Sequence, residues 1–347
     1  MKVPEPIKLP SGAWRIQLRL GGESISITRA KKEDCMNAAL KAKTKYITEQ
    51  KRQKKRISQG TKKLTLQAIQ DDYIKANTPV LSPATVRSYK SYAKNRWTKY
   101  QGKQIGGIDW QQMINDELES VSEKTVKNAW GLVRPALEAV GYPVPSVKLA
   151  AVPVNEIAFL QPDEIKPFLQ AVEGRSYEIP ALLLLHGLRL SEVLGLQWEN
   201  VSLKNGTVTV KGAKVRGTSG LVQKKQNKNQ TSTRTVPILI PRLLSLLKAS
   251  HGVSGPVVVI NPSNLLDDVK RASERAGGTV VTCHGLRHSF ASLCYYLEIP
   301  ERQIQEWGGW KDRTTLHRIY IRLTAAGESE AKNKVTAFFT DDKKVKK

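Results

Sequence analysis

The sequence predicts a multidomain protein that is mainly α-helical and carries small β-sheets. Three observations predict it: the length of 347 residues, an alternating apolar pattern near the N-terminus, and helical patterns over most of the remainder. Since a domain usually holds roughly 100–200 residues, this length suits two or three domains. We expect a three-stranded sheet plus helix over residues 1–60, a helical domain over 64–150, and a mixed α/β domain over 151–347.

The first strands follow from a period of two. From residue 14 to residue 20 every second side chain is apolar, and Arg15 and Arg19 lie between them. This alternation is typical of a half-buried strand. It resumes over residues 24–28 after Gly21 and Gly22, which permit a tight turn, so we expect a hairpin.

A third strand over residues 7–9 and a helix from about residue 32 to residue 50 complete the predicted N-terminal unit. The helix is needed because a sheet this small is not stable without a partner on one face. The free face then presents Arg15 and Arg19, which are candidate DNA contacts. An ordinary solvated face is the alternative interpretation.

Basic residues dominate the segment that follows. Residues 51–63 are rich in Lys and Arg and include Ser58-Gln59-Gly60, a composition that predicts a mobile basic linker. Lys54 and Lys55 are its candidate contacts to a phosphate backbone.

Helical patterns fill residues 64–150. Ser82 followed by Pro83 is a typical helix start, and further helices are expected over 110–118 and 122–140. On the helix that begins at Pro83, basic side chains lie off the apolar stripe. They are candidate DNA contacts, and they are Arg87, Lys90 and Lys94.

Charge is the strongest signal in the composition. The chain has 56 Lys and Arg against 31 Asp and Glu, which leaves a net charge of +25. Residues 1–63 hold 17 of the basic and 5 of the acidic residues, so they alone carry +12. Such a field attracts a polyanion, and DNA or RNA is the commonest one. A ribosome-associated or merely soluble basic protein is the alternative.

Other features argue against a membrane or secreted protein. No apolar run approaches the roughly 20 residues that a helix needs to cross a bilayer, and the opening MKVPEPIKLPSG lacks the apolar stretch of a signal peptide. Cys35, Cys283 and Cys294 show neither metal-ligand spacing nor a disulfide framework. This usage favours the reducing cytoplasm.

Three segments of the second half carry side chains suited to phosphate chemistry. Arg189 lies in the sequence Gly-Leu-Arg-Leu-Ser-Glu, and Arg287 closes the sequence His-Gly-Leu-Arg that starts at His284. Tyr320 follows Arg287 by 33 residues, and Trp310 lies ten residues before that tyrosine.

Together these side chains can attack a phosphodiester without a metal or a cofactor. A phenol has a pKa of about 10, so it is a poor nucleophile until a proton acceptor and a clamp for negative charge assist it. Two guanidiniums supply bidentate donors to the non-bridging phosphate oxygens. An imidazole and an indole N–H complete the cradle.

Residues 156–339 resemble the tyrosine recombinases of the phage-integrase family, because the arginine motif, the His-x-x-Arg motif and the terminal tyrosine follow in that family's order. The helical segment over 64–150 is similar to the family's core-binding domain. Residues 1–60 are similar to the three-stranded arm-binding domain of mobile-element integrases. The resemblance makes residues 151–347 the catalytic domain.

The resemblance implies a role for each side chain. Arg189 and Arg287 match the arginines that clamp the scissile phosphate, and His284 matches the proton acceptor. Tyr320 matches the nucleophile. Trp310 stands where the family most often has histidine. Its indole N–H can still donate to a phosphate oxygen although it cannot act as a base, and we expect the ring to brace the pocket as well.

Two further roles rest on the resemblance. Glu192, one helical turn after Arg189, is expected to orient that arginine or neighbouring donors. A hairpin lysine protonates the leaving 5′ oxygen in this family, and Lys228 is the best match because it shortly precedes an Arg-x-Val-Pro strand. Lys225 is the second choice. The other histidines, His288 among them, are interpreted as structural.

The function implied is site-specific integration and excision of a phage or mobile element through a 3′-phosphotyrosyl intermediate, with no metal or cofactor. The implied partners are double-stranded DNA at core and arm attachment sites, three further copies of the chain in a tetramer on DNA, a host DNA-bending protein and an excisionase. The implied location is the cytoplasm of a prokaryotic host, at the nucleoid. A type IB-like topoisomerase and a catalytically silent DNA-binding regulator of the same fold are the alternatives.

Overall fold

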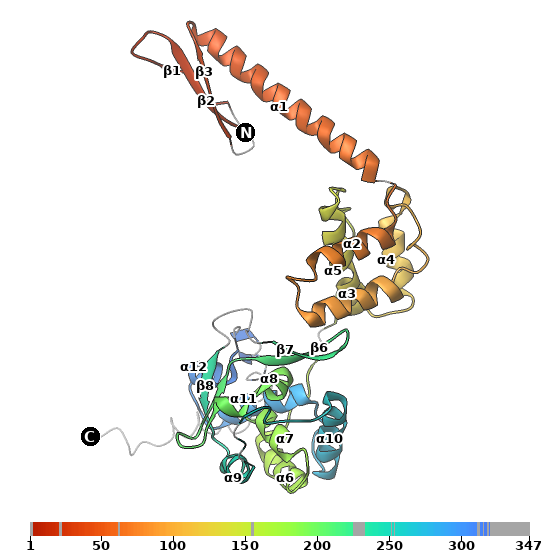
Figure 1. The fold of residues 1–347 in the computed structure, drawn as a ribbon, viewed down its shortest axis with the longest axis vertical. Helices are drawn as coiled ribbons and strands as arrows, with labels where there is room; N and C mark the ends of the chain where they lie inside the picture. The colour runs from red at the N-terminus through yellow and green to blue at the C-terminus, as the bar shows by residue number, and fades with distance from the viewer. Residues whose placement is uncertain are drawn as a thin grey trace, which may run out of the picture. The chain divides into compact units, whose positions relative to one another are not determined.

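The structure is a computed structural model. It describes residues 3–20, 23–61, 63–153, 156–224, 233–250, 252, 254–310, 313, 314, 316, 317 and 319, and of residues 23, 49–61 and 224 it describes the secondary structure only. The chain divides into two compact units, Met1–Val152 and Pro153–Lys347 (Figure 1). The fold is mostly helical with small antiparallel sheets, as predicted.

The predicted three-stranded sheet is present at the N-terminus. Its antiparallel strands lie in the order β1 (Ile7–Lys8), β2 (Trp14–Leu20) and β3 (Glu23–Arg29). The apolar side chains of β2 are buried and pack against Cys35 and Ala39 on helix α1 (Lys32–Thr61). One face of the sheet is therefore covered by the helix, and the alternate residues of β2 are exposed.

Helix α1 corrects one prediction. It runs through Thr61, whereas the sequence predicted a helix to about residue 50 followed by a mobile linker. Lys, Arg and Gln are all good helix formers, and no proline interrupts this stretch. The positive charge therefore does not prevent the helix from continuing. The side chains of Lys54 and Lys55 lie outside the described residues.

The rest of the first unit is helical. Its helices are α2 (Leu66–Asn77), α3 (Pro83–Asn95), a 3₁₀ turn η1 (Ile105–Gly107), α4 (Trp110–Leu118) and α5 (Glu123–Ala139). The side chain of Ser82 accepts a hydrogen bond from the Thr85 N–H and caps α3, which begins where the sequence predicted. Residues of α2, α4 and α5 share one core, which includes Leu66, Met113 and Val133.

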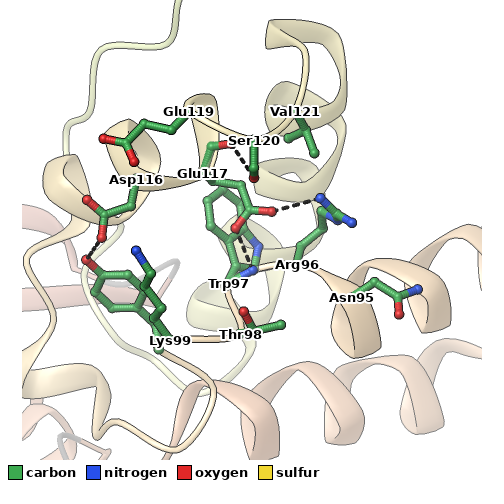
Figure 2. A pocket seen from close by; sticks show the side chains of 11 residues that line it. Asn95, Arg96, Trp97, Thr98, Lys99, Asp116, Glu117, Glu119, Ser120 and Val121 are labelled. Atoms are coloured by element: carbon green, nitrogen blue, oxygen red, sulfur yellow. Dashed lines mark hydrogen bonds and ion pairs between the residues drawn. The ribbon is translucent and has the colours of Figure 1, made fainter.

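Helix α3 ends two residues before Trp97, which adopts a left-handed backbone conformation with φ of 57°. Glu117 stabilises the backbone at Trp97, because its carboxylate accepts hydrogen bonds from Arg96 Nη1 at 3.0 Å and from the Trp97 N–H at 2.8 Å (Figure 2). A pocket of about 400 Å³ lies beside Trp97, and Glu117, Asp116 and Glu119 are among the residues that line it. Three acidic residues against two basic ones, Arg96 and Lys99, give this lining no excess of positive charge for a phosphate, so this pocket is not the candidate site.

The second unit contains most of the helices and two small sheets. Its first half holds α6 (Pro162–Val172), α7 (Glu178–Leu185), α8 (Leu190–Gly195), a 3₁₀ turn η2 (Trp198–Asn200), β4 (Val201–Ser202), β5 (Thr207–Val210), β6 (Ala213–Gly217) and β7 (Gly220–Lys224). Its second half holds β8 (Arg234–Pro237), α9 (Pro241–Ala249), α10 (Pro262–Arg275), α11 (Cys283–Tyr296) and α12 (Glu301–Gly308). Strands β4, β5 and β8 form one antiparallel sheet, and β6 and β7 form a hairpin.

Helix α11 packs against four other helices of the second unit. Ten of its fourteen residues are buried, and it contacts α6, α7, α10 and α12 (Figure 1). At the end of α7, Gly187 has φ of 91°, and a Cβ at this position would lie 2.8 Å from the Phe290 ring on α11. Glycine is therefore required for the turn that leads from α7 to Arg189.

No helix in the described part of the chain is both long and apolar enough to cross a membrane.

Candidate active site

Arg189 precedes helix α8 and is held by Glu192. The Arg189 N–H donates to Glu192 Oε2 at 2.9 Å, and its Nη1 donates to Glu192 Oε1 at 2.7 Å. Its Nη2 donates to the Gly309 carbonyl at 2.7 Å, across 120 residues of sequence. The Arg189 side chain is 39% exposed, whereas that of Glu192 is only 4% exposed. The buried Glu192 therefore orients Arg189, while solvent still reaches the guanidinium of Arg189.

Arg287 on α11 is the buried arginine of the site. It is 1% exposed, and its Nη1 donates to the Gly187 carbonyl at 2.6 Å. Its Nε has no hydrogen-bond partner among the described residues. Burial, followed by the positive charge of Arg189, lowers the pKa of Arg287 to about 9. That value still lies above neutral pH, so the guanidinium keeps its charge.

Trp310 covers Arg287. The centroid of its ring lies 4.1 Å from Arg287 Cζ, a cation–π contact in a site shielded from water. The indole is 9% exposed and belongs to an apolar cluster with Phe159 and Phe290. Gly309, directly before it, takes the left-handed conformation that ends α12. The ring therefore packs against both the arginine and the core.

His284 lies one helical turn before Arg287 and is exposed. Partial desolvation, followed by the charges of Arg287 and Arg189, lowers the pKa of His284 below its ordinary value of 6.5. The imidazole is therefore neutral at pH 7 and able to accept a proton. Its Nε2 lies 3.2 Å from Nε2 of His288, a residue that the sequence had suggested was structural.

Sequence reasoning missed the contribution of Arg234. This residue begins β8, and its Nη2 and Nη1 donate to the two oxygens of Glu192 at 2.9 and 3.2 Å. Burial alone would raise the pKa of Glu192, but Arg234, followed by Arg189, lowers it to about 2. The Arg-x-Val-Pro motif marked the position of Arg234 in the sequence. Its partner lies 42 residues upstream, so no local pattern connected the two.

Two predicted residues, Tyr320 and Lys228, lie outside the described residues, as does the second-choice Lys225. Ile319, which directly precedes Tyr320 in the sequence, is 2% exposed and belongs to the same apolar cluster as Trp310. Ile319, the residue before the tyrosine, therefore packs in the same cluster as Trp310 of the site.

The predicted DNA contacts that the structure describes are on the surface. Arg15 and Arg19 are exposed on β2, where Arg15 Nε donates to Ser26 Oγ at 2.8 Å. Three basic side chains on α3 are exposed as well, and they are Arg87, Lys90 and Lys94. In the described ranges, no group of three or more His, Cys, Asp or Glu side chains is arranged to hold a metal ion.

Residues 158–326 match the model of the phage integrase family, a stretch that contains every residue of this site. The matched stretch is a little less than half of the chain and is similar to that family. Its relatives include a XerC-like tyrosine recombinase of Caldanaerobacter subterraneus subsp. tengcongensis, 27% identical over 51% of this chain and 53% of that protein. A XerA tyrosine recombinase of Pyrococcus furiosus is 29% identical over 50% of this chain and 59% of that protein. The chain thus spans little more than half the length of these two relatives.

Solved integrase structures share the fold. The Tn1549 transposon integrase in complex with transposon right end DNA has a TM-score of 0.58 at 16% identity, over 77% of this chain and 99% of that one. A lambda integrase tetramer bound to a Holliday junction has a TM-score of 0.56 at 16% identity, over 89% of this chain and 96% of that one. The integrase-family fold therefore extends beyond the stretch that the family model matches.

Proposed function

We propose that this chain is a site-specific DNA recombinase that cleaves and rejoins DNA through a 3′-phosphotyrosyl intermediate. The observation that carries the proposal is the meeting of Arg189, Arg287 and Trp310, which come from three separate segments. Arg189 Nη2 bonds the carbonyl of Gly309, and Arg287 packs on the ring of the next residue. Two guanidiniums and an indole suit a phosphate with two non-bridging oxygens.

The proposed reaction is nucleophilic substitution at phosphorus. The phenolic oxygen of Tyr320 bonds to phosphorus, and the bond to the 5′ oxygen breaks. His284 takes the phenolic proton, and Lys228 gives a proton to the leaving oxygen. The phosphotyrosyl ester retains the energy of the broken bond, so the 5′-hydroxyl of a partner strand can reverse the attack. The neutral state of His284 at pH 7 supports its role as acceptor.

The two arginines contribute differently to charge stabilisation. The side chain of Arg189 is 39% exposed and makes direct hydrogen bonds to the phosphate. Arg287 is only 1% exposed and is covered by Trp310, so it acts on the phosphate through its charge. A charge in a site shielded from water interacts more strongly than one in solvent. Arg287 therefore stabilises the developing negative charge even though Trp310 covers it.

The segment that delivers the nucleophile also supports the proposal. Ile319 is buried in the cluster that contains Trp310 and Phe290, and Tyr320 is the next residue. The proposed attack needs the tyrosine and the arginines at one phosphate. The burial of Ile319, the residue before the tyrosine, in the cluster of Trp310 supports this arrangement.

The proposed substrate is double-stranded DNA with core and arm attachment sites, and the proposed assembly on DNA is a tetramer. The lambda integrase with a similar fold is a tetramer on a Holliday junction, which favours this assembly. A host DNA-bending protein and an excisionase complete the proposed partners, and a phage or mobile element in a prokaryotic host is the proposed setting. The exposed basic residues of β2 and α3 are the proposed DNA contacts.

A covalent adduct tests the proposal. Duplexes that bind the full chain are selected from a random-sequence pool, nicked near the contacted site, incubated with protein and then denatured in detergent. We expect a protein–DNA adduct with wild-type protein and none with Tyr320→Phe, and we expect a chelator to leave the yield unchanged. Binding without an adduct would favour the catalytically silent regulator.

Recombination between two sites on separate plasmids distinguishes a recombinase from a type IB-like topoisomerase. A recombinase joins the plasmids, whereas a topoisomerase relaxes each plasmid and joins none. We expect joined plasmids, and relaxation alone would refute the proposal.

Removal of residues 1–61 tests the arm-binding role of the N-terminal sheet and α1. We expect the truncated chain to cleave a core site at the wild-type rate and to lose integration. Substitution of Arg15 and Arg19 by Ala in the full chain should reproduce the integration defect, since both are exposed on β2. Equal integration by the truncated chain would refute the arm-binding role.

A further inference from the structure

We propose that Arg234 is a positioning residue for the cleavage reaction, acting through Glu192 on Arg189 and through the end of α12 on Trp310. The inference rests on the proposed recombinase function. It adds a third arginine, which does not contact the substrate, to Arg189, which is proposed to bind the phosphate directly, and Arg287, which is proposed to act through its charge.

The guanidinium of Arg234 joins two elements of the site. Two of its nitrogens donate to Glu192 at 2.9 and 3.2 Å, and its Nε donates to the Trp307 carbonyl at 2.9 Å. The side chain is only 9% exposed. Because a planar guanidinium fixes its donors in one fork, these bonds set the position of α8 relative to the end of α12.

The same guanidinium packs against the turn that carries Trp310. A Cβ on Gly309 would lie 2.7 Å from Arg234 Nη1, so the backbone of the turn rests on the guanidinium. The Gly309 carbonyl accepts the hydrogen bond from Arg189 Nη2. Arg234 therefore supports the peptide that holds Arg189 as well as the residue that covers Arg287.

Arg234 also balances the charge of Glu192. That carboxylate is 4% exposed and lies 2.7 Å from Arg189 Nη1, 2.9 Å from Arg234 Nη2 and 3.9 Å from Arg287 Nη1. With Arg234 present, three guanidiniums face one carboxylate, which leaves two positive charges for a phosphate. Without Arg234, the carboxylate would neutralise Arg189, the arginine proposed to bind that phosphate directly, because a buried charge needs a partner.

The test compares three variants on the selected, nicked duplex: R234Q, R234K and the double variant E192Q/R234Q. We measure the rate of adduct formation at saturating protein and, separately, the protein concentration that half-saturates the DNA. R234Q is expected to slow cleavage by roughly 10- to 100-fold, the usual cost of misplacing reactive groups by about 1 Å. The half-saturating concentration should stay close to the wild-type value.

The other two variants separate charge from fold. R234K keeps the positive charge and loses the fork, so its rate should lie between those of wild type and R234Q. E192Q/R234Q should cleave faster than R234Q, because the carboxylate that would neutralise Arg189 is gone. If Arg234 only stabilised the fold, the double variant would cleave more slowly than R234Q, since the double variant loses more hydrogen bonds.

Arg242 offers a matched control. Its Nε and Nη2 donate to the buried carboxylate of Glu178 at 2.8 and 3.2 Å, so it makes the same kind of pair in the same unit. R242Q should lower the melting temperature and leave the cleavage rate unchanged at a temperature where the variant is folded. If R234Q does not fold, the rate of R234K relative to that of R242Q decides the question.

Equal cleavage by R234Q and R242Q would overturn the positioning role, and so would a double variant no faster than R234Q. A wild-type chain that forms no adduct would instead refute the recombinase function itself. The two failures are therefore distinguishable in one experiment.

Discussion

Arg287 Cζ lies 4.1 Å from the centroid of the Trp310 ring, and both side chains are at least nine-tenths buried. A guanidinium on an aromatic face in a shielded site is attracted by the ring, with an energy of up to about 2 kcal/mol. Trp310 thus both covers a charge and fills an apolar cluster. Its two roles can be separated by substitution.

Substitution of Trp310 separates the ring from its N–H. Trp310→Phe keeps an aromatic face for Arg287 and removes the donor, whereas Trp310→Ala removes both and is expected to cost about 3–5 kcal/mol of stability. We expect slower cleavage from Phe with a small change in melting temperature, and partial activity from Trp310→His. Wild-type cleavage by Trp310→Phe would show that the indole does not donate to the phosphate.

Gly309→Ala should lower the cleavage rate by more than the cost of its left-handed backbone conformation explains. Gly309 has φ of 67°, and an added Cβ would meet Arg234 Nη1 at 2.7 Å. Gly174 has φ of 71° with no atom within 4 Å of such a Cβ, so Gly174→Ala carries the backbone penalty alone, roughly 1–2 kcal/mol. Thermal melts and adduct rates of both variants should show cleavage lost only at Gly309. Equal cleavage by the two variants would contradict the contact.

The rate of cleavage should depend on pH through His284. Because its pKa is lowered from the ordinary 6.5, the imidazole is mainly neutral at pH 7, and a rate that needs the neutral form should change little from pH 8 down to 7. The rate should fall only at more acidic pH, as the ring gains its proton. His284→Gln should be slow and should lack this acid limb. A wild-type rate that already falls by half above pH 7 would contradict a neutral acceptor.

Glu192 should stabilise the fold only where it is ionised. Its pKa in the folded chain is about 2, below the ordinary 4.5, so its contribution is complete above about pH 4.5 and is lost as the pH falls toward 2. The shift corresponds to about 3 kcal/mol at pH 7. Urea unfolding of wild type and Glu192→Gln should differ by roughly 1 kcal/mol less at pH 3.5 than at pH 7. A difference that is independent of pH would contradict the shifted pKa.

Local patterns predicted much of the fold. The alternation over residues 14–20 and the start of α3 at Pro83 both agree with the structure. Each depends on residues close together in the sequence. The linker predicted over residues 51–61 is wrong for a local reason too, because the Lys and Arg residues of that stretch favour a helix.

The site could be predicted where one motif contained both partners. Arg189 and Glu192 are three residues apart, so the sequence indicated their contact, and the structure contains it. Arg234 contacts Glu192 from 42 residues away, and Arg189 bonds Gly309 across 120 residues. Contacts between residues so far apart in the sequence depend on how α8, β8 and α12 pack. The spacing of residues along the chain does not indicate that packing.

The covalent link itself tests the account most directly. The adduct trapped on the selected duplex is digested with protease and nuclease, and the peptide that carries the nucleotide is sequenced by mass spectrometry. We predict a single phosphoester on Tyr320, joined to the 3′ side of the cleaved strand. A nucleotide attached to any other residue, or an adduct that persists in Tyr320→Phe, would contradict the account.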